Sequence, residues 1–569
     1  MKSRKRYYFA AIGIIVLIVV IKYVISSQNI RLITDNTAFE RDDEWDNVIN
    51  GAINSEKIVL KIDGKNIDIS EEDVYFDEDM IPHINLKVLR HHLLCAVNTY
   101  PDGKILIEKR NTKLEIYDSE HIVKVDGEIM PEVSPITYVG GAPFISAELI
   151  NKYLDYEYEW DAMNNTICLA DTHADKKIYP YMYDYRTIGK APLIKNQGKF
   201  GTCWAFSAMT ALESSVLPGC SADYSEDHMT YHNGYSSDIM GGYVHLALAY
   251  LTAWKGPVLE AEDPYGDGKS PDDLYPVMHV QEVQIIENKN IEEIKQAVFL
   301  YGGVQTSIYM LQDRPSNEAS EYYNPETASY CYIGIEKPNH AVTIIGWDDN
   351  YKADNFSTVP IGDGAFICAN SWGENYGDKG YFYVSYYDSN IGTNNVVYTC
   401  VQGTDNYDNI YQSDLTGQAG QIGYKRDNGY FANVYEAKSD EKLRAVGFYS
   451  LGTGSQYEVY FIDNYKDTDS FQNKTLVAKG LLNNAGYYTI DIKGDFFLKK
   501  GQKSAVMVFI KTPSVKSPIA MECKMDDDND GFILEDGEGY VSYNGNIWEH
   551  TEEKFKCNIC LKMYTDNRK

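Results

Sequence analysis

The chain has 569 residues, more than one hydrophobic core can organise, so we expect three to four domains. Its 52 Lys and Arg residues against 83 Asp and Glu residues give a net charge of −31. A surface this acidic repels phosphate backbones, which argues against a nucleic-acid partner. A hydrophobic content of 44% argues against general disorder, and ten cysteines in a chain of this length do not form a disulfide scaffold.

The chain begins with a basic and then an apolar segment. Four basic residues precede an uncharged apolar run from Phe9 to Ile21. A helix over residues 1–26, at about 1.5 Å per residue, would span a bilayer with its basic flank in the cytoplasm. We therefore predict a single-pass protein of the cell membrane, anchored by residues 1–26 with a polar tether at residues 27–56 and the remaining bulk extracellular. The alternative is a cleaved signal peptide and a secreted protein.

Residues 57–172 contain an internal duplication. The sequence VLKIDG at residues 59–64 is matched by IVKVDG at residues 122–127, and IPHIN at 81–85 by APFIS at 142–146. Asn85 and Ser146 are N-cap residues, each followed by a short apolar helical pattern. The segment is thus predicted to be an α+β unit with two related halves. The pattern resembles the copper amine oxidase N-terminal-like (stalk) domain of bacterial surface proteins, which implies a spacer or adhesion module.

The stretch at residues 191–214, APLIKNQGKFGTCWAFSAMTALES, predicts a reactive cysteine. Good helix formers follow Cys203 at helical spacing, which predicts a helix that begins at this residue. A thiol at a helix N-terminus lies at the positive end of the helix dipole, which favours the nucleophilic thiolate. The pattern therefore predicts covalent chemistry at Cys203.

Three more motifs follow in order: MGG at residues 240–242, NHAVTIIGW at 339–347 and NSWG at 370–373. His340 lies 340 − 203 = 137 residues after Cys203, within the window expected of papain-type enzymes. With these motifs, residues 173–402 resemble the papain family of cysteine peptidases. The resemblance implies an α+β fold with a helical left lobe and a β right lobe, and peptide hydrolysis through a thioester without a cofactor.

The resemblance also implies roles for individual residues. Cys203 would be the nucleophile, His340 its proton partner and Asn370 the group that orients the imidazole. The Gln197 side-chain amide and the Cys203 backbone N–H would form the oxyanion hole. Four residues would contact substrate or cover the site: Gly241, Gly242, Asn339 and Trp372.

Two departures from the family pattern are present. Phe200 and Ile239 stand where the family has two bridged cysteines, so we expect a hydrophobic contact between them in place of the disulfide. No helical inhibitory propeptide of the usual pattern precedes residue 173, because the duplicated segment occupies that place.

Residues 403–569 are predicted to form a second β-rich domain. Runs such as those at residues 445–449, 457–462, 487–492 and 505–510 are strand patterns separated by turn residues. We predict a β-sandwich of jelly-roll type that resembles lectin-like domains, with a carbohydrate or the cell wall as its ligand. Asp526, Asp528 and Asp530 have the opening spacing of a calcium loop, but Gly537 at the twelfth position excludes an EF-hand; a solvated acidic turn is the alternative.

Together these patterns predict an extracytoplasmic cysteine endopeptidase that acts on protein or peptide substrates. The alternative is a surface adhesin, or a carbohydrate- or peptide-binding protein, that does not catalyse a reaction. A cell-wall amidase would share the Cys-His chemistry but would lack the Gln197 and NSWG context.

Overall fold

The computed structural model describes residues 58–568, except 68, 70–72, 118–121, 132–135, 236–240, 312–316, 526–530 and 535–537. Three predictions fall outside the described residues: the anchor at 1–26, the tether at 27–56 and the calcium candidates Asp526, Asp528 and Asp530.

The prediction of a single-pass membrane protein is corrected. Within the described ranges, no helix is long and apolar enough to cross a membrane. A membrane span needs about 20 apolar residues. The longest helix in those ranges, α5 (Cys203–Val216), has 14 residues. The prediction is therefore wrong for the part of the chain that the structure describes, and we do not retain it.

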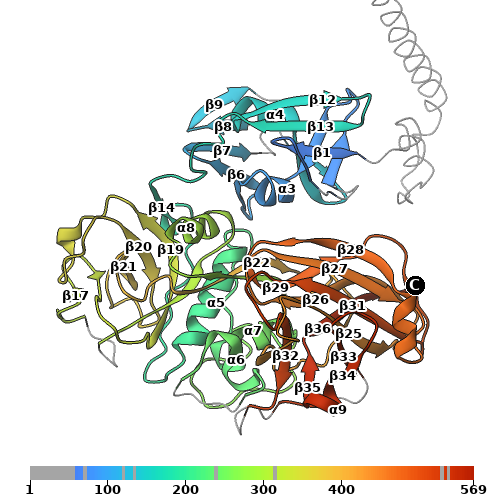
Figure 1. The fold of residues 1–569 in the computed structure, drawn as a ribbon. Coiled ribbons are helices and arrows are strands. Elements are labelled where there is room, and N and C mark those ends of the chain that lie inside the picture. Colours follow the sequence, from blue (N-terminus) through green and yellow to red (C-terminus); the bar gives the residue numbers. More distant parts are fainter. Residues whose placement is uncertain are drawn as a thin grey trace, which may run out of the picture. The chain divides into compact units, whose positions relative to one another are not determined.

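The N-terminal region repeats one order of elements, as the duplication predicts (Figure 1). Asn85 and Ser146 cap the two helices as expected, through bonds from the backbone N–H groups of Lys87 and Leu149. Sheet pairing interleaves the halves in the orders β12-β13-β1-β2, β10-β11-β4-β3 and β5-β6-β7-β8-β9. The resemblance to the copper amine oxidase N-terminal-like domain stays a prediction. The elements are β1 (Val59–Ile62), β2 (Lys65–Ile67), β3 (Val74–Phe76), β4 (Pro82–Asn85), α3 (Leu86–His91), β5 (Ala96–Thr99), β6 (Lys104–Lys109), β7 (Thr112–Tyr117), β8 (Ile122–Val125), β9 (Glu128–Pro131), β10 (Ile136–Val139), β11 (Ala142–Ser146), α4 (Ala147–Tyr153), β12 (Tyr156–Asp161) and β13 (Thr166–Asp171).

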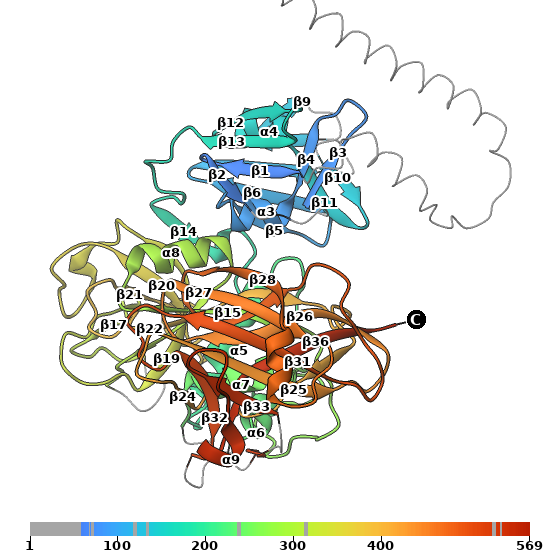
Figure 2. The ribbon, with the colours of Figure 1, turned by 45° about the vertical axis from the view of Figure 1, so that its right-hand side comes forward.

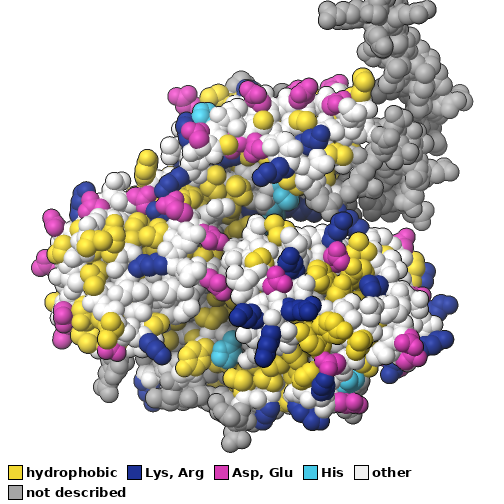
Figure 3. Space-filling model, viewed as in Figure 1, with side chains coloured by type: hydrophobic (Ala, Val, Ile, Leu, Met, Phe, Trp, Pro, Cys, Tyr) yellow, Lys and Arg dark blue, Asp and Glu magenta, His cyan; other side chains and the backbone are white. Residues whose placement is uncertain are grey.

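The central region has two lobes with separate cores. Apolar side chains of α5, α6 and α7 form one core, and those of α8 and the strands β19, β20 and β21 form the other. Figure 3 shows hydrophobic side chains gathered on the surface of the lobe that carries β17, β20 and β21. The elements are β14 (Met182–Asp184), η3 (Tyr185–Thr187), α5, α6 (Glu226–His232), α7 (Val244–Thr252), β15 (His279–Glu287), α8 (Ile291–Leu300), β16 (Val304–Ile308), β17 (Tyr323–Asn324), β18 (Ser329–Tyr330), β19 (His340–Asp348), η4 (Ala353–Asn355), β20 (Ala365–Ala369), β21 (Tyr381–Ser385) and β22 (Asn394–Gln402).

The C-terminal region is the expected β-rich domain, and all four predicted strands are present, in β26, β27, β29 and β31. A sheet in the order β28-β27-β31-β25-β33-β34 and the strands β29, β26 and β36 contribute apolar side chains to one core, among them Phe431, Phe448 and Val508. The elements are β23 (Asn409–Tyr411), β24 (Gly420–Ile422), β25 (Asn428–Glu436), β26 (Glu441–Ser450), β27 (Ser455–Ile462), η5 (Thr468–Asn473), β28 (Thr475–Leu482), β29 (Ala485–Asp491), β30 (Phe497–Leu498), β31 (Lys503–Lys511), β32 (Ile519–Cys523), β33 (Gly539–Ser542), β34 (Glu549–His550), α9 (Thr551–Phe555), β35 (Cys557–Ile559) and β36 (Leu561–Asn567).

One sheet runs through both of these domains (Figures 1 and 2). Its order is β17-β18-β21-β20-β19-β16-β22-β15-β29-β26-β36-β23, so β15 pairs with β22 on one edge and with β29 on the other. Thr489 Oγ1 also donates to Gln281 Oε1 across the boundary, at 2.7 Å. The C-terminal domain thus covers an edge strand that would otherwise present unpaired N–H and C=O groups.

Gly486 of β29 lies at this junction, where the backbone leaves no room for a side chain. Its φ is +144°, and an added Cβ would lie 2.0 Å from the carbonyl oxygen of Val283 in β15. We expect Gly486→Ala to lower the free energy of unfolding by about 3 kcal/mol or more, from backbone strain and the clash together. The matched control is Gly454→Ala, at a φ of +69° with open space around the site, which should cost about 1–2 kcal/mol. Urea unfolding followed by tryptophan fluorescence measures both, and equal losses would contradict the account.

Candidate active site

Cys203 is the first residue of α5, as predicted, and its side chain is half-buried. Burial by itself would raise the pKa of the thiol, but a hydrogen bond with His340 and the charge of that imidazole lower it below the ordinary value of 9.0. Buried cysteines elsewhere show the opposite effect: burial raises the pKa of Cys95, Cys331 and Cys557 to about 12. Cys203 thus differs from these cysteines in that a neighbouring imidazole lowers the pKa of its thiol, which favours the thiolate form.

His340 and Asn370 come together from neighbouring strands. His340 begins β19 and Asn370 directly follows β20, which pairs with β19. His340 Nε2 lies 2.8 Å from Asn370 Oδ1. A carbonyl oxygen only accepts, so Nε2 donates to it and Nδ1 remains for the thiol. Trp372 stacks on the imidazole with ring centroids 4.7 Å apart and is 7% exposed, so it covers this hydrogen bond.

Gln197 has its amide fixed in one orientation. Its Oε1 accepts from Ser371 Oγ at 2.6 Å, and its Nε2 donates to the Phe200 carbonyl at 2.7 Å. The backbone N–H of Gln197 also donates to the Ser371 carbonyl at 2.8 Å. An amide nitrogen has two hydrogens, so one Nε2–H remains available to donate to a bound group.

Buried hydrogen bonds hold α5 against the strands that carry the histidine. Gln305 Nε2 on β16 donates to the Trp204 carbonyl at 3.0 Å, and Thr343 Oγ1 on β19 donates to the Ser207 carbonyl at 2.9 Å. At the other end of the helix, the Gly303 N–H donates to Ser214 Oγ at 2.6 Å. These bonds set the register between the helix that begins at Cys203 and the strand that begins at His340.

The residues predicted to contact substrate have different surroundings. An added Cβ at Gly242 would lie 2.2 Å from Trp204 Nε1, so the backbone here approaches the indole too closely for a side chain. Gly241 is in open space. Asn339 accepts from the Met310 N–H and donates to the Met310 carbonyl, so its amide brackets a backbone segment. The expected contact of Phe200 with Ile239 lies outside the described residues on the Ile239 side.

An ion cluster forms around Lys195, two residues before Gln197, and was not predicted. Lys195 Nζ lies 2.8 Å from Glu213, 2.7 Å from Asp223 and 2.9 Å from Glu226. Burial raises the pKa of Glu226 to about 8 even though Lys195 lowers it. Glu213 belongs to α5 and Glu226 to α6, so the cluster ties the chain before Gln197 to both helices.

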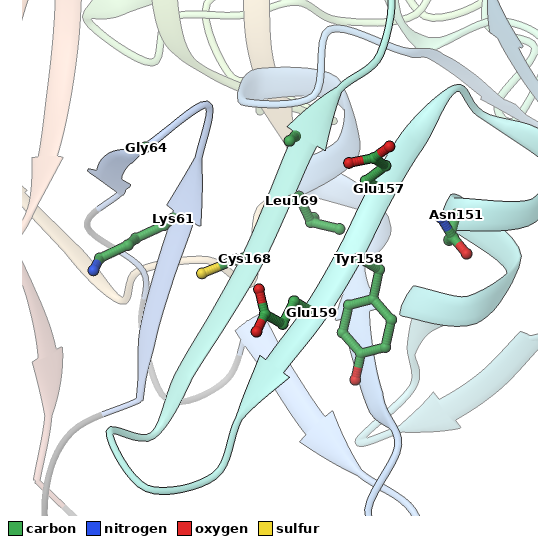
Figure 4. Close-up of a pocket in the computed structure, with 9 residues that line it drawn as sticks. Lys61, Gly64, Asn151, Glu157, Tyr158, Glu159, Cys168 and Leu169 are labelled. Carbon is green, nitrogen blue, oxygen red and sulfur yellow. The ribbon is translucent and has the colours of Figure 1, made fainter.

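A pocket of about 500 Å³ lies elsewhere, on the N-terminal domain (Figure 4). It is lined by Glu157, Tyr158 and Glu159 of β12, by Cys168 of β13 and by Asn151 of α4, among others. The lining residues include no histidine that could act as a base for Cys168. In the part of the chain that the structure describes, no group of three or more His, Cys, Asp or Glu side chains could hold a metal ion.

Comparison with known families identifies two segments. Residues 179–401 match the papain family cysteine protease, and residues 410–565 match the lectin like domain. A viral cathepsin from Epiphyas postvittana nucleopolyhedrovirus is 28% identical over 209 residues, and pro-cathepsin H from Bos taurus is 30% identical over 217 residues. Each match covers 36% of this chain, which spans 58% and 60% of the length of these two relatives.

Solved structures extend the similarity to both domains. The clostridial cysteine protease Cwp84, after propeptide cleavage, is 30% identical with a TM-score of 0.59, over 68% of this chain and 99% of that chain. The cysteine protease and lectin-like domains of Cwp84, described as a surface layer associated protein of Clostridium difficile, are 29% identical with a TM-score of 0.57, over 68% of this chain and 89% of that chain.

The lowered pKa of Cys203 gives a test by pH. Iodoacetamide reacts with the thiolate, so the pH dependence of alkylation reports the pKa of the thiol. For wild-type Cys203 we expect the midpoint of this pH dependence to lie below the ordinary value of 9.0. In His340→Ala the stabilising partner is gone while burial remains, so the midpoint should move above 9. Mass spectrometry of the Cys203 peptide measures the rate, with His173→Ala, at a histidine two residues after the end of β13, as control. A wild-type midpoint at or above 9, or an unshifted midpoint in His340→Ala, would contradict the assignment.

Proposed function

Because the chain belongs to the papain family of cysteine proteases, we propose that it is an active endopeptidase that hydrolyses peptide bonds through a thioester on Cys203. The observation that carries the proposal is a hydrogen-bonded series of three side chains: the Cys203 thiol hydrogen-bonds to the His340 imidazole, and the Asn370 amide orients that imidazole.

The steps follow from the positions of these groups. His340 takes the thiol proton, which leaves a thiolate beside an imidazolium. The thiolate attacks the peptide carbonyl, and the Gln197 Nε2–H and the Cys203 backbone N–H stabilise the oxyanion that forms. His340 then gives its proton to the leaving amine as the tetrahedral intermediate collapses to the acyl thioester. Finally, His340 activates a water molecule that hydrolyses the thioester and regenerates the thiol.

The arrangement favours catalysis over a purely binding role. A peptidase-shaped domain that only binds peptides would not need a thiol with a lowered pKa beside an imidazole fixed through Nε2. Nor would it need a Gln197 amide fixed at both its oxygen and its nitrogen. Among the alternative functions, we therefore rank a non-catalytic adhesin second and a cell-wall amidase third.

The setting of the enzyme is part of the proposal. The match of residues 410–565 to the lectin like domain supports a carbohydrate ligand for the C-terminal domain. The similarity to Cwp84, a surface layer associated protein, supports action outside the cytoplasm on protein substrates.

Hydrolysis of a quenched fluorescent peptide library tests the function. We expect wild-type cleavage and a loss of about 10⁴-fold or more in kcat for Cys203→Ala, because the nucleophile is removed. Gln197→Ala should lose about 10²- to 10³-fold in kcat, because one oxyanion donor is removed. The control Cys220→Ala, at a half-buried cysteine beyond the end of α5, should retain activity. A folded wild type that binds peptides without cleaving them would favour the binding protein instead.

A further inference from the structure

The two oxyanion donors stand at the two ends of one short loop. Gln197 supplies its Nε2–H and Cys203 its backbone N–H, and residues 198–202 connect them. No disulfide bridges this loop, because residues 198–202 include no cysteine. The separation of the two donors therefore depends on non-covalent contacts of the loop.

The hydroxyl of Tyr265 contacts both ends of this loop. Tyr265 Oη donates to the Gln197 carbonyl at 3.0 Å and lies 2.6 Å from Thr202 Oγ1. A phenol has one proton, which goes to the carbonyl, so the Thr202 hydroxyl donates to Tyr265 Oη. Two consecutive hydrogen bonds thus connect the Thr202 hydroxyl, next to Cys203, with the backbone carbonyl of Gln197. Hydrogen bonds in such a series polarise and strengthen one another.

Tyr265 is itself held in place from several sides. Its ring meets the Phe206 ring edge-on with centroids 4.7 Å apart, and the Phe200 ring edge-on at 6.2 Å. Its backbone N–H donates to Glu260 Oε1 at 2.8 Å, and the next N–H, of Gly266, donates to Asp227 Oδ2 at 2.7 Å. Burial raises the pKa of Tyr265 to about 12, so the hydroxyl keeps its proton at neutral pH.

We infer that Tyr265 is a positioning residue for the oxyanion hole: through Gln197 and Thr202 it sets the separation of the two donors. Phe200 takes part through the edge-on packing of its ring against the Tyr265 ring. Oxyanion donors act only when they lie about 2.7–3.1 Å from the charged oxygen of the transition state. Loosening them should therefore lower kcat while leaving ground-state binding nearly unchanged.

The inference rests on the proposed peptidase activity, and two conservative variants test it. Tyr265→Phe removes the hydroxyl and keeps the ring, and Thr202→Val removes the second bond at similar volume. We expect each to lower kcat for peptide hydrolysis about 5- to 50-fold with KM within about twofold, less than the loss of a whole donor. The double variant should lose little more than Tyr265→Phe alone, because both substitutions break one chain. The matched control is Tyr275→Phe, at a tyrosine that is 81% exposed.

Two further readouts separate positioning from a general structural role. The affinity for a peptide aldehyde, whose adduct places an oxyanion in the hole, should fall by a factor similar to that in kcat. Alkylation of Cys203 by iodoacetamide uses no oxyanion donor and should stay unchanged. An unchanged kcat in both variants, or alkylation that falls in parallel with kcat, would overturn the inference. If Tyr265→Phe does not fold, Thr202→Val decides by the same readouts. An inactive wild type would instead refute the proposed function.

Discussion

The hydrogen bonds between α5 and the strands β16 and β19 are the constraint on which the site depends. They join a helix of one lobe to strands of the other, and they are buried, so breaking one leaves an unsatisfied polar group at a cost of about 1–3 kcal/mol. Since α5 begins at Cys203 and β19 begins at His340, a fixed register between them brings the thiol to the imidazole. The catalytic distance is thus set by bonds along the body of the helix, away from the reacting atoms.

The C-terminal domain extends this framework. The pairing of β15 with β29 continues the sheet that contains β19, so the strand carrying His340 belongs to the same hydrogen-bonded sheet as strands of the lectin-like domain. The cluster around Lys195 fixes the chain before Gln197, and the hydroxyl of Tyr265 bonds Gln197 and Thr202, at the two ends of the loop that leads to Cys203. Charge pairing, sheet pairing and a phenol each restrain a different side of the site.

Local patterns predicted much of this arrangement. The helix at Cys203, the caps at Asn85 and Ser146 and the C-terminal strands could be read from nearby residues, because capping and side-chain periodicity are local properties. The partners of Lys195, the bonds of Tyr265 and the β15–β29 pairing join residues far apart in the sequence, and no motif marks them. Ser371 was missed although it lies inside the NSWG motif beside Asn370; its bond to Gln197 could have been sought there. The membrane prediction rested on the apolar run at residues 9–21 and its basic flank, and no helix among the described residues is long and apolar enough to cross a membrane.

The central claim is that Cys203, of ten cysteines, is the catalytic thiol paired with His340. The most direct measurement is the site and stoichiometry of covalent labelling by the epoxide inhibitor E-64, mapped by peptide mass spectrometry on the folded full-length chain. The account predicts one adduct per chain, on Cys203, and none in His340→Ala over the same time, since the epoxide needs an activated thiolate. Labelling spread over several cysteines, labelling that persists in His340→Ala, or a folded wild type that stays unlabelled would contradict it.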